Sequence, residues 1–456
     1  MRKILIFLIL FSISHLFILT AEDTDENDIF STETEEDIFS EEELFSDGED
    51  VIIDDATPGD NDEIVYSEDD LIITEDEITD EDLFNILDSE SVTFTGDISS
   101  IFGYSFKREV LLEGEDFKEN TYSTYMEADL LLDVRLKKGI KAFGNLGVGY
   151  FPAQTLDTAI LLKEFFIDLN YENIVYLRAG KQVLTWGRGY LWNPTDLLNR
   201  ERKSFIDMDA LREGVYGLKM HIPFGTLVNI YGFLDTTDAQ NVTDFAAAAK
   251  LEFLIFNTEI AVSGWFKDKF IPVFGIDFST RLFDIDLYGE ASISYGDNIK
   301  KYSTVKQEFI SIRDEWVTQI SIGGTIFFDL LDVKDRISLT GELYYNHAGY
   351  EDNVFESEAL GTFFESGDLI HNRYGIYYGA FYLNANKFLL SDMVLNISTI
   401  GNFSDISFMV NSGITYNPVN NFTLGFNIIA NIGEEYKEYT VAGIAMSANI
   451  TASLSF

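Results

Sequence analysis

The last stretch of the chain, Val441–Phe456, restricts the fold more than any other. From Ala442 onward, apolar residues alternate with small or polar ones at every step, and the stretch contains no charge and no proline. A strand with this period of two has one apolar face and one polar face. Such a strand needs an apolar environment on one side, which is either a protein core or lipid. The terminal residue, Phe456, favours lipid because a soluble sandwich rarely buries such a pattern to its last residue.

This end of the chain resembles the closing strand of bacterial outer-membrane β-barrels. The resemblance implies a location in the outer membrane of a diderm bacterium and contact with outer-membrane lipid. It also implies that the barrel-insertion machinery is a partner, which recognises the strand ending at Phe456.

The first residues fit export to that compartment. Arg2 and Lys3 precede a short apolar run that is followed by acidic residues, as in a secretory signal peptide cut near Ala21. An uncleaved anchor is the alternative. The chain has 0 Cys, which excludes disulfides and a lipoprotein anchor. No later segment has the run of apolar residues that a membrane-spanning helix requires. The signal peptide is therefore assigned to residues 1–21.

Residues 22–90 form an acidic leader with 31 acidic residues and no Lys, Arg or His. Such a self-repelling composition does not bury enough apolar surface to fold alone, so we expect a disordered periplasmic segment. Apolar pairs such as Ile29-Phe30 and Leu44-Phe45 recur behind an acidic residue. They suggest, as an alternative to a plain spacer, short motifs that dock a periplasmic partner. Weak calcium binding has little support because the D-x-D-x-D-G spacing is absent.

From residue 91 to 456 the sequence consists of segments in which apolar and polar residues alternate with a period of two. The clearest are Tyr122–Leu136, Asp284–Tyr295 and Arg336–Asn346, in which aliphatic residues alternate with charged or polar ones. Charges within a strand suit a wall with lipid outside and water inside. We count about eighteen such strands, with about sixteen as the alternative, which predicts an all-β, antiparallel up-and-down transmembrane barrel.

The connections between these strands give an independent test of the count. Every second connection is short, and all the long ones belong to the alternate set, at 107–120, 187–211, 296–312 and 349–370. Outer-membrane barrels have short periplasmic turns and longer external loops. The pattern therefore predicts an even strand number with both termini in the periplasm.

The most distinctive local sequence is 178–202, RAGKQVLTWGRGYLWNPTDLLNRER. Its order G-x-Q-x-x-x-W-G followed by N-P-x-D-L-L resembles a signature of porin-like outer-membrane channels of diderm bacteria, including alginate-export-type barrels. The matching positions are Gly180, Gln182, Trp186, Gly187, Asn193, Pro194, Asp196, Leu197 and Leu198. The basic lumen of an alginate exporter is not evident here, so the resemblance implies a channel without implying its substrate.

The same stretch is expected to leave the fifth strand at Trp186 and to form the third external loop. Asn193-Pro194-Thr195-Asp196 predicts a turn, followed by a short capped helix through Asp196–Asn199. Our hypothesis is that the loop folds into the barrel and narrows it, with Trp186, Arg188, Asn193, Pro194, Asp196, Arg200, Arg202 and Lys203 at the constriction. The basic side chains of the loop would face acidic side chains of the wall. Opposite charges on two sides of the lumen create an electric field across it, and this field sets ion preference. The predicted wall residues are Glu127, Asp129, Asp133, Arg135, Glu164, Asp168, Arg178 and Gln182. The alternative is a structural cap with no role in selectivity.

No catalytic motif is present, since nucleophile-elbow, Walker and H-E-x-x-H patterns are absent. No cofactor or metal site is expected because paired ligand spacing is missing, and the net charge of −47 opposes nucleic-acid binding. The sequence therefore predicts passive, porin-like passage of small polar solutes or ions, with a mild preference for cations. A surface barrel without transport, such as an adhesin, is the alternative. A transporter of hydrophobic solutes ranks third because it would need an apolar lumen.

Overall fold

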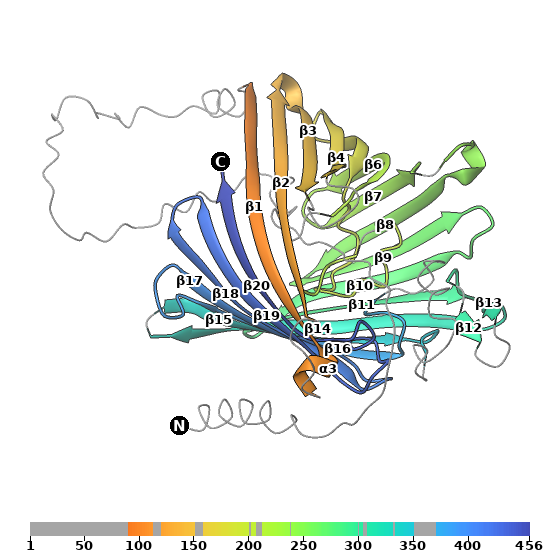
Figure 1. Ribbon diagram of the computed structural model, residues 1–456. Helices are drawn as coiled ribbons and strands as arrows, with labels where there is room; N and C mark the ends of the chain where they lie inside the picture. Colours follow the sequence, from red (N-terminus) through yellow and green to blue (C-terminus); the bar gives the residue numbers. More distant parts are fainter. Residues whose placement is uncertain are drawn as a thin grey trace, which may run out of the picture.

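The computed structural model describes residues 90–456, apart from 113–119, 151–157, 200–201, 207–211, 238, 300, 304–307, 332 and 351–370. Eighteen antiparallel strands of this part of the chain form one sheet, and β1 pairs with both β2 and β20, so that the sheet closes into a barrel (Figure 1). The predicted fold class and strand number are confirmed. The signal peptide, the acidic leader and Arg200 lie outside the described residues.

The strands of the barrel are β1 (Ser91–Lys107), β2 (Thr121–Leu136), β3 (Ile140–Tyr150), β4 (Thr158–Tyr171), β5 (Val175–Gln182), β6 (Val215–Phe224), β7 (Val228–Asp235), β8 (Ala246–Ile255), β9 (Thr258–Lys267), β10 (Val273–Leu282), β11 (Ile285–Tyr295), β14 (Trp316–Leu330), β15 (Val333–Asn346), β16 (Tyr377–Asn386), β17 (Met393–Asn402), β18 (Ser407–Val419), β19 (Phe422–Ile432) and β20 (Ile444–Ser455). A separate small hairpin joins β12 (Lys301–Ser303) to β13 (Glu308–Ile310).

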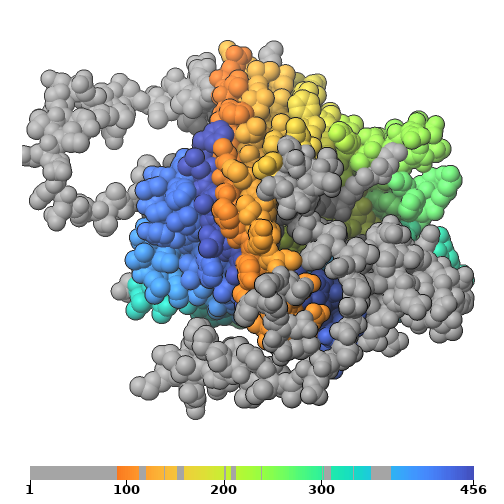
Figure 2. Space-filling model, in the orientation of Figure 1, coloured from red at the N-terminus to blue at the C-terminus, as the bar shows by residue number. Residues whose placement is uncertain are grey.

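The seam between β1 and β20 shows how the alternation becomes an inside and an outside. Phe102 pairs with Ile450, and both are more than half exposed on the outer face. The next pair along the strands, Gly103 and Asn449, lies on the opposite face. Figure 2 shows the two terminal strands side by side on the surface of the barrel. The two-faced strand predicted at the C-terminus is therefore present, with its apolar face outward.

The long connections all leave the same rim of the barrel. They join β1 to β2, β5 to β6, β11 to β14 and β15 to β16, whereas turns such as those between β8 and β9 or β10 and β11 take two residues. This confirms the predicted parity. The short helix α3 (Arg108–Leu112) lies in the connection between β1 and β2, and the 3-10 turn η4 (Val242–Asp244) lies between β7 and β8 at the same rim; η3 (Lys137–Gly139) joins β2 to β3. Among the described residues, no helix is both long and apolar enough to cross a membrane.

Two local predictions around the connection between β5 and β6 are wrong. The fifth strand ends at Gln182 and not at Trp186, because the backbone N–H of Val183 donates to the Glu164 carboxylate, 2.8 Å away, instead of continuing the ladder. The expected helix at 196–199 is absent from the described chain. In its place the Asp196 carboxylate accepts the N–H groups of Leu198 and Asn199, at 3.2 and 3.1 Å, which forms an Asx-type turn.

Candidate functional site

The connection between β5 and β6, residues 183–214, is called the inner loop below. It bonds to side chains of the inner face of the barrel along most of its described length. Its two ends are fixed on β4, where Val183 donates to Glu164 and the N–H of Gly214 donates to the Lys163 carbonyl at 3.0 Å. Its first and second halves are tied together by Asn199, whose amide accepts from the N–H of Leu184 and donates to the Leu184 carbonyl.

Glu290 of β11 holds the centre of the inner loop. This side chain is 3% exposed and accepts four hydrogen bonds from the loop. The donors are the N–H of Gly189 at 2.6 Å, the amide of Asn193 at 2.9 Å, and the N–H and hydroxyl of Thr195 at 3.1 and 2.6 Å. A buried carboxylate requires such compensation, and the loop N–H groups require an acceptor, so each satisfies the other.

Glu342 of β15 provides a second anchor. Its carboxylate accepts the N–H groups of Leu191 and Trp192, at 2.9 and 2.8 Å, and the hydroxyl of Tyr288 at 3.1 Å. The indole N–H of Trp192 donates to the Asn372 carbonyl at 2.7 Å, beyond the end of β15. Two wall carboxylates therefore fix the backbone of residues 189–195.

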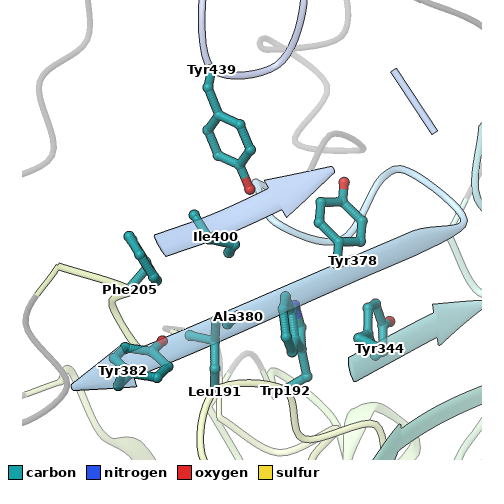
Figure 3. Close-up of a cluster of buried hydrophobic side chains, with 9 residues drawn as sticks. All are labelled: Leu191, Trp192, Phe205, Tyr344, Tyr378, Ala380, Tyr382, Ile400 and Tyr439. Carbon is teal, nitrogen blue, oxygen red and sulfur yellow. The ribbon is translucent and has the colours of Figure 1, made fainter. Parts of the chain in front are cut away.

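Aromatic packing covers this second anchor. Trp192 stacks on Tyr344 with ring centroids 5.4 Å apart and an interplanar angle of 7°, and it also contacts Tyr378. Tyr190 and Phe205 pack against Tyr382. The cluster combines loop residues with the inner faces of β15, β16 and β17, as Figure 3 shows. The inner loop is thus packed against one side of the barrel interior.

Arg188 binds a different part of the wall. Its guanidinium contacts Glu252 of β8 and Glu259 of β9, and it lies 3.2 Å from Asp277 of β10. Lys250 donates to the Trp186 carbonyl at 2.8 Å and lies 3.1 Å from Asp277. Burial alone would lower the pKa of Arg188, but the three carboxylates raise it above its ordinary value, so the arginine stays charged. We call Arg188, Lys250 and the three acids the charged cluster.

Two further bases of the loop bond to backbone carbonyls and not to wall acids. Arg202 donates to the Asp196 carbonyl, and Lys203 donates to the carbonyls of Gly189 and Tyr190 at 2.8 and 3.0 Å. Burial, followed by repulsion from Arg373, lowers the pKa of Arg202 to about 10. Burial also lowers the pKa of Lys203. Both cations are half-buried and brace the loop from within.

The acids predicted to face Arg188 do not contact it. They stand on β2 and β4, whereas the partners of Arg188 stand on β8, β9 and β10. The predicted wall residues instead contact one another or the loop ends: Lys163 with Asp129 at 2.9 Å, Arg178 with Asp168 at 2.7 Å, Lys141 and Arg135 with Asp133 at 3.1 and 3.4 Å, and Glu164 with Val183. Gln182 is fully buried at the end of β5, and Glu127 is buried on β2.

The most strongly bonded wall residues, Glu290, Glu342 and Asp277, were missed as site residues. Glu290 and Glu342 occupy the polar face of strands whose alternation is clear in the sequence. The available signal was a carboxylate in the middle of a strand, flanked by apolar residues. The described part of the chain holds no group of His, Cys, Asp and Glu that is arranged to bind a metal ion.

No protein-family model and no curated protein matches this sequence. Solved structures do match. OccK9 (OpdG) of Pseudomonas aeruginosa superposes with a TM-score of 0.51 at 8% identity, covering 80% of this chain and 98% of that chain. OccK2 (OpdF) of the same organism, solved in complex with glucuronate, gives the same TM-score, identity and coverage. The fold is that of an outer-membrane porin. At 8% identity the likeness concerns the fold alone.

Proposed function

We propose that this protein is a porin-like channel of the outer membrane of a diderm bacterium, through which small polar solutes or ions pass passively. The observation that carries the proposal is the inner loop, which is fixed by Glu290, Glu342 and the charged cluster inside a closed barrel. A loop that lies inside a barrel narrows the path for solutes, and the groups that fix it determine which solutes pass.

We further propose a mild preference for cations. The charged cluster has three carboxylates for two cations, Arg188 and Lys250. Glu290 and Glu342 are 3% and 2% exposed and their charges act on Lys203 of the loop, so we set them against the loop cations and do not add them to this excess. The expected preference is mild because it rests on the single excess carboxylate of the charged cluster.

The direct test is electrical. The purified full-length protein is inserted into planar bilayers under a salt gradient, and the single-channel conductance and reversal potential are measured. We expect discrete conductance steps and a reversal potential whose sign indicates selectivity for cations. Arg188→Ala should shift the potential further toward cations and enlarge the steps, and Glu259→Gln should shift it toward anions.

Arg135→Ala provides the matched control. Arg135 is exposed, stands on β2 and pairs with Asp133, whereas the partners of Arg188 stand on β8, β9 and β10, so the same change in charge is made on another part of the wall. An anion-side potential in the wild type, or equal shifts for Arg188→Ala and Arg135→Ala, would refute the assigned selectivity. A sealed barrel in liposome-swelling assays would refute the channel itself and favour a surface barrel without transport.

A further inference from the structure

Five neighbouring strands of the barrel carry no charged residue. The strands β16, β17, β18, β19 and β20 contain no Asp, Glu, Lys or Arg, although they follow one another around the sheet. By contrast, charged side chains are paired across β2 to β5 and across β8 to β10. One sector of the wall is therefore uncharged.

The inner face of the uncharged sector is rich in asparagine. A row of directly paired positions crosses it in register: Asn384, Asn396, Gly413, Asn427, Asn449 and, on β1, Gly103. Phe426 and Ile450, which adjoin Asn427 and Asn449, are exposed on the outer face, as is Phe381, three residues before Asn384. Because side chains alternate along a strand, the row itself faces the interior. We call these six positions the amide row.

The amide row runs obliquely from one rim toward the other. It begins at Asn384, two residues before β16 ends at a short turn, and it reaches Gly103, four residues before β1 ends at a long loop. Neighbouring strands lie about 4.8 Å apart, so the row offers hydrogen-bonding groups at nearly regular steps along the interior.

The glycines of the row make room for the amides beside them. A Cβ at Gly413 would lie 3.4 Å from the amide oxygen of Asn427, and one at Gly103 would lie 2.7 Å from that of Asn449. These amides therefore lie over the neighbouring strand and form a shallow polar surface. A larger side chain at either glycine would displace them.

Several amides near the row have hydrogen-bonding capacity that the described protein atoms do not use. The side-chain oxygens of Asn411, Asn427 and Asn431 have no hydrogen-bond partner within the described structure. Asn411 is 6% exposed and lies on the same inner face, two residues before Gly413. A buried polar atom of this kind is costly unless a partner reaches it, and an amide that turns about its last torsion can present either its oxygen or its nitrogen.

We propose that the amide row is the binding track for uncharged, polyhydroxylated solutes, that is, sugars and polyols. This inference rests on the proposed channel function. A hydroxyl both donates and accepts hydrogen bonds, as does a primary amide, so the two match without any charge. An ion on this row would lose water without gaining a counter-charge, and it is better served by the charged strands.

The experiment compares glucose with gluconate, which has a similar size but carries a carboxylate. Swelling rates of proteoliposomes containing the full-length protein are measured for both solutes, and ion conductance is recorded on the same preparation. For Asn427→Leu we expect glucose entry to fall about threefold to tenfold, as for the loss of one hydrogen bond, with ion conductance little changed. Asn427→Ser, which replaces the amide with a hydroxyl and so keeps a hydrogen-bonding group, should lie in between.

Asn229→Leu is the matched control, because Asn229 is an inward-facing amide of β7 that bonds to Glu252 within the charged part of the wall. It should reduce glucose entry no more than it reduces ion conductance. Equal glucose rates for Asn427→Leu and the wild type, with normal conductance, would overturn the amide row and leave the channel intact. Absence of both swelling and conductance in the wild type would overturn the channel and, with it, this inference. Heat-modifiable electrophoretic migration verifies that each variant is folded.

Discussion

The strongest quantitative expectation concerns Glu290, which accepts four hydrogen bonds from the inner loop. A hydrogen bond to a charged group contributes about 1.5–3 kcal/mol, and four bonds to one carboxylate are not additive. The loop also keeps its anchors at Glu342 and in the charged cluster. We therefore expect Glu290→Ala to weaken docking of the loop by about 3 kcal/mol, since it leaves the buried N–H groups of Gly189 and Thr195 unpaired.

Such a loss raises the population of the undocked loop about 100-fold, because 1.4 kcal/mol corresponds to a factor of ten. Limited trypsin digestion in detergent, followed by mass spectrometry, measures this population as the rate of cleavage after Arg188. When the loop opens and closes faster than it is cut, the cleavage rate follows the open population. Glu290→Gln keeps the size of the side chain but places an NH₂ group among the loop donors, so its rate should be intermediate.

Asp286→Ala is the control for this experiment. Asp286 lies on the same strand and the same face as Glu290, and its partner is the exposed Arg281 at 3.5 Å. Its cleavage rate should stay within about twofold of the wild type, as surface ion pairs contribute little. If Glu290→Ala were cut no faster than Asp286→Ala, the carboxylate would not be the anchor, and the reasoning from hydrogen bonds would fail.

Three further outcomes are expected. Trp192→Ala should lower the free energy of unfolding by about 3–5 kcal/mol because the Trp192 side chain is 1% exposed. Trp316→Ala, on the outer face, should lower it much less. Urea titration in detergent measures both changes. Burial raises the pKa of Glu438, in the connection between β19 and β20, so the folded protein holds a proton that the unfolded chain releases, and stability should fall as pH rises from the ordinary glutamate value through the raised one. Glu438→Gln should remove that slope in urea midpoints measured at a series of pH values above the ordinary glutamate value. Phe456→Ala should reduce the heat-modifiable, folded fraction in isolated outer membranes more than Leu454→Ala, which leaves the terminal ring in place.

The barrel could be predicted because its signals are local. A period of two in Val441–Phe456 specifies two faces without reference to any other strand, and the lengths of successive connections give the parity of the strands. Both survive errors of a residue or two at each strand end. The end of β5 illustrates such an error, since a single hydrogen bond from Val183 to Glu164 ends the ladder four residues before Trp186.

The partners of the inner loop could not be predicted in the same way. Arg188 meets Glu252, Glu259 and Asp277 only because three strands, far from it in the sequence, bring their inner faces under the loop. The sequence indicates that these acids face inward but not at which level of the wall each stands. The height of a residue in the wall depends on the register of every strand pair between it and the loop, and the sequence does not give these registers. The acids of β2 and β4 were therefore equally plausible partners.

The arrangement of acids along the wall has a cause that precedes any role in selectivity. A segment without regular secondary structure inside a barrel must satisfy its backbone N–H groups on the wall, because it has no ladder of its own. Serine or asparagine would offer weaker acceptors, whereas the carboxylates of Glu290 and Glu342 each accept two backbone N–H groups of the loop. Part of the acidic excess of the barrel is thus required to hold the inner loop. The same loop brings Arg188 to the carboxylates of β8, β9 and β10, which links the anchoring of the loop to the proposed cation preference and leaves the proposed amide row as the uncharged side of the same interior.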